Sequence, residues 1–108
     1  MKLWIDDVRP APEGYVWCKS THSACRNISC FTHEPDDRPI ETDIELIDID
    51  HDSGDFYSDG GDFIKVLEWM EYRYGSKINW NIRIHSMNPV GVANMRAIIE
   101  RNGWKEIK

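Results

Sequence analysis

Residues 43–50 read Asp-Ile-Glu-Leu-Ile-Asp-Ile-Asp, an isoleucine-rich segment in which acidic and aliphatic side chains alternate. The aliphatic residues keep no single strict period, which is typical of a central strand that is covered on both faces. A glycine- and aspartate-rich stretch follows at residues 51–61 and indicates a loop. Residues 43–50 therefore predict a buried strand in the middle of a sheet, with acidic side chains where the strand ends.

Strands and a helix are also expected on the amino-terminal side of this segment. Short apolar runs at residues 2–6 and 15–18 predict strands. Ser20 and Thr21 can cap a short helix that extends to about Phe31. The polar, proline-containing stretch 33–42 predicts a connector.

On the carboxyl-terminal side the helical signals are stronger. Apolar residues recur at i, i+3, i+4 and i+7 over residues 63–74 and predict an amphipathic helix. A strand is expected at 79–84, followed by a helix that Asn88 caps and Gly103 ends. Residues 104–107 predict a final short strand. Strands and helices alternate along the chain, which favours a parallel sheet.

This order predicts one α/β domain over residues 1–108, a flavodoxin-like or receiver-like three-layer sandwich with a mostly parallel sheet of about five strands. Residues 7–14, between the first two strands, are fewer than a parallel crossover usually needs. Either an irregular loop replaces the first helix, or the second strand lies antiparallel at the edge. We also expect the last helix to be absent, because the sequence stops at Lys108.

Charge and composition narrow the classes of function. Residues 34–62 hold 12 acidic residues and one arginine, a net charge of −11, whereas the rest of the chain carries 7 acidic residues against 12 Lys and Arg, a net charge of +5. An acidic chain is poorly suited to general duplex nucleic-acid binding. No apolar run approaches membrane-spanning length, no signal-peptide core is present, and three cysteines suit a reducing compartment. We expect a cytoplasmic protein without membrane contact.

Polar side chains follow three of the expected strands. Asp6 and Asp7 follow the first, residues 50–52 follow the third, and residues 85–86 follow the fourth. Ligands bind outside the carboxyl ends of parallel strands, where these side chains would meet. Crowded carboxylates repel one another, and a hard divalent cation such as Mg²⁺ or Mn²⁺ relieves the repulsion. We expect Asp6, Asp7 and Asp50 to bind such a cation, the alternative being that all three are solvated strand ends.

Two histidines adjoin this expected cation site. His51 and His85 could act as general acid and base, because imidazole titrates near neutral pH. One would activate a water and the other would protonate the leaving oxygen of a cyclic phosphate. Each histidine taken singly could equally be structural. Asp50 and His51 would face opposite ways in a continuous strand, so one of them must lie beyond its last regular residue.

The motifs KLWIDDVRPAPEGYVW at residues 2–17, DHD at 50–52 with Gly54, and HSMNPVG at 85–91 with Asn94 and Met95 occur in this order along nearly the whole chain. In these motifs the sequence resembles the cyclic-phosphate-processing receiver domains.

The resemblance implies a receiver fold in which an acidic pair and the aspartate after the third strand hold Mg²⁺ and accept a phosphoryl group. Asp6, Asp7 and Asp50 match those positions, and Ser86 matches the residue that contacts the phosphate. The family adds four further polar residues and is thought from these to act on cyclic phosphates. Receivers also carry a lysine after the fifth strand, for which Lys105 or Lys108 would stand in. The additional family residues are His51, Asp52, His85 and Asn88.

The leading hypothesis is a metal-dependent phosphoesterase that acts on a small phosphate-containing ligand or an RNA end, namely a cyclic nucleotide or an RNA 2′,3′-cyclic end. Ser86, Asn88 and Arg9 would hold the phosphate, and Asp52 is a possible accessory residue. The alternative is a non-catalytic module that binds a phosphorylated ligand or partner, or is phosphorylated at Asp50. A third hypothesis, a protein-interaction module, rests only on small size and abundant aromatic residues.

Two rival cation sites are weaker. His22, Cys25, Cys30 and His33 have side chains suitable for zinc, but their spacing is not that of a standard finger. The acidic run from Asp48 to Asp59 is similar to a calcium loop, although its glycine falls one position late. Buried thiols, surface histidines and a plain acidic loop are the simpler interpretations.

Overall fold

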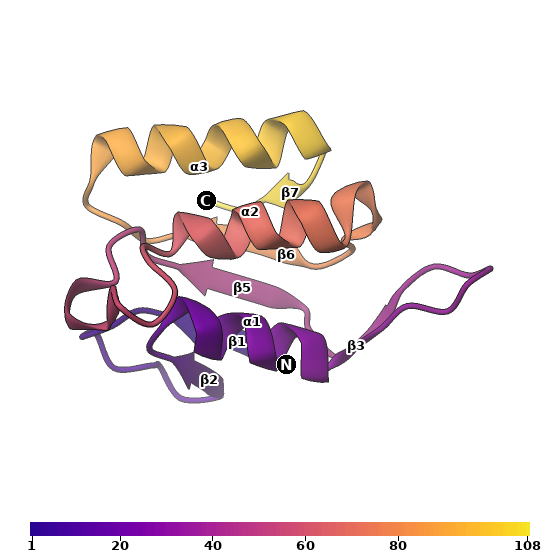
Figure 1. The fold of residues 1–108 in the computed structure, drawn as a ribbon, viewed down its shortest axis with the longest axis horizontal. Helices are drawn as coiled ribbons and strands as arrows, with labels where there is room; N and C mark the ends of the chain where they lie inside the picture. The colour runs from indigo at the N-terminus through magenta and orange to yellow at the C-terminus, as the bar shows by residue number, and fades with distance from the viewer.

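The computed structural model describes residues 1–108. Its main sheet contains five strands in the order β2-β1-β5-β6-β7, and every neighbouring pair is parallel (Figure 1). The second strand of the chain is therefore parallel to the first, which settles the choice that the short link leaves open. The strands are β1 (Lys2–Ile5), β2 (Tyr15–Cys18), β5 (Leu46–Ile49), β6 (Asn81–Ile84) and β7 (Lys105–Glu106).

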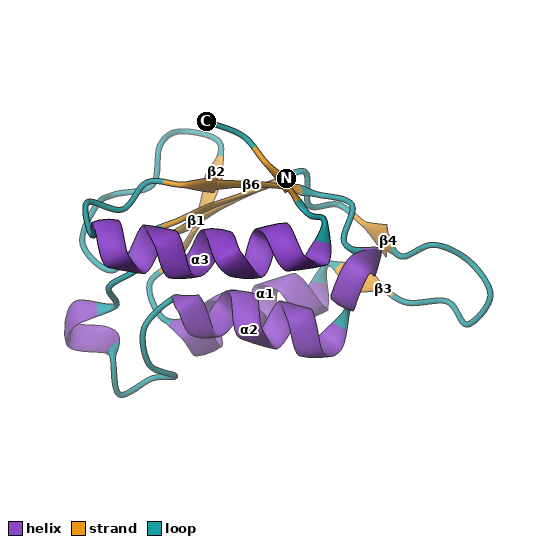
Figure 2. Ribbon diagram, turned by 90° about the horizontal axis from the view of Figure 1, so that it is seen from above, coloured by secondary structure: helices purple, strands orange, loops and turns teal.

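All three α-helices lie on the same side of this sheet (Figure 2). Crossovers between parallel strands are right-handed, so links that step across a sheet in the same direction share one face. The links β2 to β5, β5 to β6 and β6 to β7 step in one direction and contain the helices. The receiver-like class is confirmed, with two layers in place of the expected three. The helices are α1 (Thr21–Cys30), α2 (Ile64–Arg73) and α3 (Pro89–Asn102), with two short 3₁₀ segments, η1 (Gly54–Phe56) and η2 (Gly75–Lys77).

The link from β1 to β2 is the only one that steps the other way, and it is an irregular loop. This loop lies beside the opposite face of the sheet, because the indole Nε1 of Trp4 donates to the carbonyl of Arg9 at 2.8 Å. The expected replacement of the first helix by a loop is confirmed. Much of that face consequently carries no helix.

The hydrophobic core lies between the sheet and the helices. Strand side chains alternate between the two faces, so one set from each strand points toward the helices. All four residues of β5 are buried, as the central position of this strand requires. The fully buried strand residues of the core are Leu3, Ile5, Cys18, Ile47, Ile49 and Ile82, and the helices contribute Ala24, Ile28, Val66, Leu67, Met70 and Met95.

The alternate strand residues form the face without helices, which we call the open face. Only Leu46 and Asp48, both on the central strand, are buried there. The others are aromatic or carry long polar side chains, unlike the aliphatic residues of the core side. The open face comprises Lys2, Trp4, Tyr15, Trp17, Leu46, Asp48, Asn81, Arg83 and Lys105.

The expected helix caps are confirmed. The Ser20 hydroxyl accepts the N–H of Ser23 at 3.1 Å, and the Asn88 side chain accepts the N–H of Gly91 at 3.0 Å. Gly103 adopts φ 69°, the left-handed conformation that ends α3 with little strain. These local signals set the helix ends, and α3 in turn presents its first turn to the carboxyl ends of the strands.

Several expected boundaries need correction, and the strands expected at 79–84 and 104–107 are confined to Asn81–Ile84 and Lys105–Glu106. The central strand is shorter than residues 43–50 and extends from Leu46 to Ile49. The connector at 33–42 begins and ends in a small antiparallel pair, β3 (Thr32–His33) and β4 (Glu41–Thr42), in which the hydroxyls of Thr32 and Thr42 lie 3.0 Å apart. No helix has the length and apolar character needed to cross a membrane.

Candidate metal and phosphate site

Three carboxylates meet where β1 and β5 end. Asp6, Asp7 and Asp50 can each place an oxygen within 4.8 Å of the others. Burial raises the pKa of Asp7, and the negative charges of Asp6 and Asp50 raise it further. The structure thus brings together the three aspartates that the sequence singled out, in an arrangement that carries an electrostatic cost.

Asp6 is held in its ionised form by the loop that it begins. Its Oδ1 atom accepts the backbone N–H groups of Val8 and Arg9, each at 3.0 Å, and its Oδ2 atom lies 2.8 Å from Nε2 of His85. Burial acts to raise the pKa of Asp6, but the hydrogen bonds from Arg9, His85 and Val8 outweigh it and lower this pKa. The carboxylate therefore stays charged and fixed in orientation.

The three carboxylates fit a hard divalent cation. Asp50 uses Oδ1 to accept the N–H of His51 at 2.8 Å, while its second oxygen accepts no hydrogen bond from the protein. A Cβ atom at Gly54 would overlap Oδ2 of Asp7, so the loop packs closely against this carboxylate. An all-oxygen donor set with an unrelieved repulsion is the chemistry that Mg²⁺ or Mn²⁺ satisfies.

His85 lies between two carboxylates. Its Nδ1 atom is 2.7 Å from Oδ1 of Asp48, its Nε2 atom is 2.8 Å from Oδ2 of Asp6, and its ring stacks on Trp4 at a centroid distance of 4.0 Å. Burial acts to lower the pKa of His85, but the bonds to Asp48 and Asp6 outweigh it and raise this pKa. The geometry is that of an imidazolium that donates both protons, which leaves neither nitrogen free for a substrate.

Asp48 is a site residue that the sequence analysis missed. Its side chain is only 3% exposed, and Arg83 approaches the second oxygen at 3.5 Å. The available signal was an acidic residue in the middle of a buried strand, where an unpaired charge is costly. Asp48, His85 and Asp6 form a continuous hydrogen-bonded chain from the open face to the three carboxylates.

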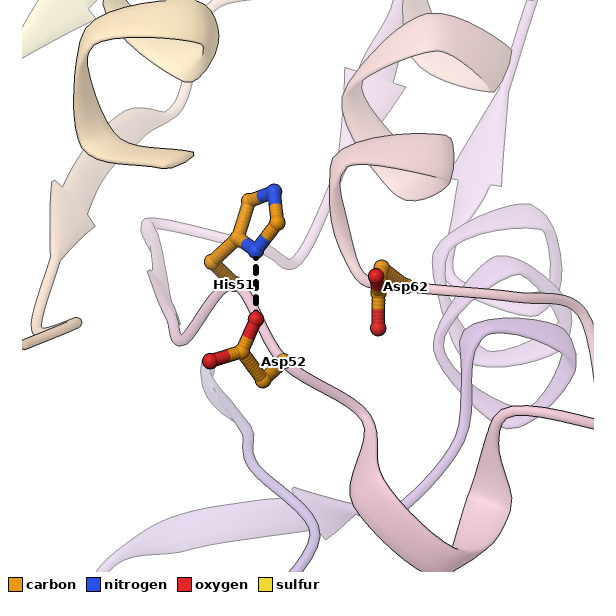
Figure 3. Close-up of side chains that lie close together, drawn as sticks. All are labelled: His51, Asp52 and Asp62. Carbon is orange, nitrogen blue, oxygen red and sulfur yellow. Dashed lines mark hydrogen bonds and ion pairs between the residues drawn. The ribbon is translucent and has the colours of Figure 1, made fainter. Parts of the chain in front are cut away.

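His51 has a different environment from His85. Its Nδ1 atom lies 2.7 Å from Oδ1 of Asp52, and Figure 3 shows the other ring nitrogen pointing away from that carboxylate. The ring is 14% exposed and packs against Gly91 of α3, where a Cβ atom would lie within 2.9 Å of three ring atoms. His51 is thus oriented by a carboxylate and a glycine, with its Nε2 atom free of protein partners.

Asp62 also lies near His51, and the sequence analysis assigned it no role in the site. His51, Asp52 and Asp62 can place ligand atoms within 4.8 Å of one another (Figure 3). Asp62 accepts hydrogen bonds from the N–H and the hydroxyl of Ser53 at 3.1 and 3.3 Å, which ties the loop to the start of α2. Asp62 therefore holds the loop at Ser53 in place, and it adds negative charge beside His51.

The three residues expected to hold phosphate lie beside this site, each with a partner in the protein. The Ser86 hydroxyl accepts the N–H of Asn88 at 3.1 Å, and Asn88 in turn caps α3 and lies 3.4 Å from Asp52. Nη1 of Arg9 donates to the carbonyl of His85 at 2.9 Å, which draws this exposed arginine to the strand ends. Donor groups are therefore present around the carboxylates.

The rival cation sites do not form. His22, Cys25, Cys30 and His33 do not gather as ligands, and His22 instead lies 3.0 Å from Asp59. The aspartates of the calcium-like run point to different partners, among them His85, His51 and Ser20. Lys105 opens β7 opposite Asn81, a strand length away from the carboxylates.

Comparison with known proteins gives one match. The family model of the cyclic-phosphate processing receiver domain matches residues 1–101. No curated protein and no solved structure matches the chain. Together with the parallel receiver-like sheet and the carboxylates at its strand ends, this match shows that the chain belongs to the family of cyclic-phosphate processing receiver domains.

Proposed function

We propose that this domain hydrolyses a cyclic phosphate with the help of a divalent cation held by Asp6, Asp7 and Asp50. The observation that carries the proposal is the placement of His51 directly after Asp50, with Nδ1 bonded to Asp52 and Nε2 free. A histidine oriented in this way, next in sequence to a carboxylate that would hold a cation, could act as a general base on a phosphate bound there.

The proton transfer falls to His51 alone. With the Nδ1 proton donated to Asp52, Nε2 carries the lone pair that accepts a proton from water as the new oxygen–phosphorus bond forms. The oxygen that leaves as the ring bond to phosphorus breaks takes a proton from solvent, and His51 returns its proton to water afterwards. The bound cation would supply charge stabilisation at the phosphoryl oxygens.

In this proposal His85 positions the carboxylate of Asp6. It does not transfer the proton, which is the role that the sequence predicted for it. Both of its nitrogens are engaged, and its Nε2–H fixes Oδ2 of Asp6, one of the three proposed ligands. Arg9, Ser86 and Asn88 remain the proposed phosphate contacts. Arg9 can contribute positive charge, since only one of its guanidinium nitrogens is used by the protein.

The test is hydrolysis of 2′,3′-cyclic nucleotides, cyclic dinucleotides and an RNA oligonucleotide with a 2′,3′-cyclic end, each with Mg²⁺, with Mn²⁺ and with a chelator. We expect metal-dependent turnover, with kcat falling by about 10²- to 10⁴-fold in His51→Gln. His22→Gln is the matched control, because His22 also pairs with an aspartate but lies beside Asp59. The control should keep wild-type kcat.

The variant at His85 separates positioning from proton transfer. His85→Gln should weaken the binding of Mg²⁺, and a higher Mg²⁺ concentration should restore part of the activity, whereas His51→Gln should not respond. Absence of turnover with every substrate, while Mg²⁺ still binds, would contradict the phosphoesterase. It would favour the receiver-like binding module, with Asp50 as the position to test for phosphorylation.

A further inference from the structure

The open face joins aromatic rings to cations in a way that the proposed hydrolysis does not use. Trp17 and Tyr15 belong to the edge strand β2. Nζ of Lys19 lies 4.4 Å from the ring centroid of Trp17, and Nζ of Lys2 lies 5.6 Å from that of Tyr15. Tyr15 also meets Trp4 edge to face at 5.8 Å. Each aromatic residue of this face therefore has a stacking or cationic neighbour and remains partly exposed.

A groove of about 250 Å³ crosses the same face near the start of the strands. Tyr15 and Lys2 line one part of it, and Asn81 and Arg83 line another, with Leu46 and Ile107 as apolar contacts and Glu45 as the one acidic lining residue. Such a groove offers a ring for stacking, an amide that can donate and accept hydrogen bonds, and two cations. These are the groups that bind a nucleobase and the phosphates on either side of it.

The charge of this region favours a polyanion. The cations of the open face lie outside the acidic stretch 34–62, in the part of the chain that carries +5, although Asp48 and Glu45 of that stretch lie on or beside this face. Of the acidic residues near the groove, Asp48 is neutralised by His85 and Arg83, and Glu45 lies 3.9 Å from the terminal ammonium. Lys2 and Lys19 are therefore left to face an anionic partner, and Arg83, whose side chain is 43% exposed, pairs with Asp48 through Nη1 alone.

The character of the face argues against a covering helix or a second copy of the chain. A parallel sheet that packs against another element presents Val, Ile and Leu, as the core side does here. The open face instead presents Lys2, Asn81 and Arg83 between its aromatic residues, and such a surface suits a ligand that alternates bases and phosphates.

The open face is also continuous with the carboxylates. The ring of Trp4 stacks on His85, whose Nε2 atom bonds to Asp6. A chain that follows the sheet from the groove toward the strand ends therefore arrives at the cluster of Asp6, Asp7 and Asp50.

From these observations we infer that the open face binds single-stranded RNA, whose 3′-terminal cyclic phosphate then reaches the three carboxylates. This inference rests on the proposed function for the choice of RNA and adds a binding site for the nucleotides before the end. The edge strand β2 holds the stacking positions, and Lys2 and Arg83 contact the phosphates.

The experiment measures the binding of a 5′-labelled RNA hexanucleotide by fluorescence anisotropy. The oligonucleotide ends in a 3′-hydroxyl, so binding does not depend on the cyclic phosphate or on turnover. Tyr15→Ala should weaken binding by about fivefold to 100-fold, the range for loss of one stacked base. Lys2→Gln should weaken it less and should reduce the salt dependence by about 0.7 in the slope of log K against log salt.

Matched controls lie on α2, on the far side of the molecule. Tyr72 is 88% exposed and Lys65 is 59% exposed, and neither belongs to the open face. Tyr72→Ala and Lys65→Gln should bind the hexanucleotide as the wild type does. Thermal melting establishes whether each variant is folded. If Tyr15→Ala is unfolded, the inference is tested with Lys2→Gln alone.

Four outcomes would overturn the inference. Three of them are the absence of measurable wild-type binding, equal losses in the α2 controls, and equal affinity for a duplex of the same sequence. The fourth is self-association of the wild type in the absence of RNA that Lys2→Gln abolishes, which would favour a second copy on this face. Binding without turnover of any cyclic phosphate would support the RNA site and contradict only the hydrolysis.

Discussion

The Nδ1 atom of His85 lies 2.7 Å from Oδ1 of Asp48, which is 37 residues earlier in the chain and belongs to the neighbouring strand. Both residues are largely buried, and the same imidazole bonds through Nε2 to Asp6. A charged histidine between two buried carboxylates is stable only while all three partners are present. This arrangement links the open face of the sheet to the proposed cation site.

Replacement of Asp48 by alanine should destabilise the fold strongly. It would leave the largely buried His85 imidazolium without one of its two carboxylates and the partly exposed Arg83 without its partner, a loss of about 3 kcal/mol or more in the free energy of unfolding. Urea denaturation of the metal-free protein measures it. Glu100→Ala, at an exposed position on α3, is the control and should change the free energy by less than about 0.5 kcal/mol. A similar small change in Asp48→Ala would contradict the assigned network.

Stability should depend on pH through His85. Its pKa is raised in the folded state, so its contribution is fully present below the ordinary value of 6.5 and is lost as pH rises through the higher folded value. Denaturation with a chelator present, at pH values from about 5 to 9, should show wild-type stability falling toward His85→Gln at the alkaline end. A constant difference between the two proteins across this range would argue against the charged imidazolium.

Asp7→Asn should have opposite effects with and without a divalent cation. Burial and the charges of Asp6 and Asp50 raise the pKa of Asp7, so removal of its charge relieves repulsion and should raise the melting temperature in a chelator. Mg²⁺ should then stabilise the wild type, by about 2.7 kcal/mol at a hundredfold excess over Kd, and the variant much less.

The control for this prediction is Asp55→Asn, because Asp55 is exposed in η1 and lies outside both groups of possible metal ligands. It should respond to Mg²⁺ as the wild type does. Equal stabilisation of Asp7→Asn and the wild type by Mg²⁺ would remove Asp7 from the proposed ligands.

Gly91→Ala should disturb His51 although it favours the helix. Alanine is a better helix former than glycine, by about 1 kcal/mol in a helix interior, but a Cβ atom at this first-turn position would overlap the imidazole ring of His51. If His51 transfers the proton, its displacement should lower kcat by about 10²-fold, as for a misplacement near 1 Å. Asn94→Ala, one turn later on α3, should keep wild-type kcat. Unchanged kcat in Gly91→Ala would contradict the proposed role of His51.

Much of the fold could be predicted because its signals are local. The cap residues Ser20 and Asn88 and the helix-ending Gly103 mark helix boundaries that the structure reproduces. The Asp43–Asp50 segment predicted a central strand, and β5 is central and buried, although it is shorter at both ends. The antiparallel pair β3 and β4 escaped prediction because two-residue strands carry no periodic pattern.

The candidate site was only partly predictable for a related reason. Asp6, Asp7 and Asp50 could be grouped because each follows a strand, and parallel strands end at one edge of the sheet. Asp48 lies within a strand. An acidic residue there can be isolated or paired with a cation, and the sequence does not show which unless the partner is known. The position of its partner His85 after a strand suggested a catalytic role. The sequence could not show that two carboxylates already bond to both nitrogens of this histidine.

The sequence by itself determined the α/β class, the order of the elements, the caps of α1 and α3, and the three carboxylates at the strand ends, since each depends on residues within a few positions of one another or on the general rule for parallel sheets. Only the tertiary structure decided that His85 is an imidazolium held by Asp48 and Asp6, that His51 keeps a free nitrogen, and that one face of the sheet is left to aromatic and cationic side chains. These features depend on contacts between residues as far as 79 positions apart and on the handedness of the crossovers, which places every helix on the same side.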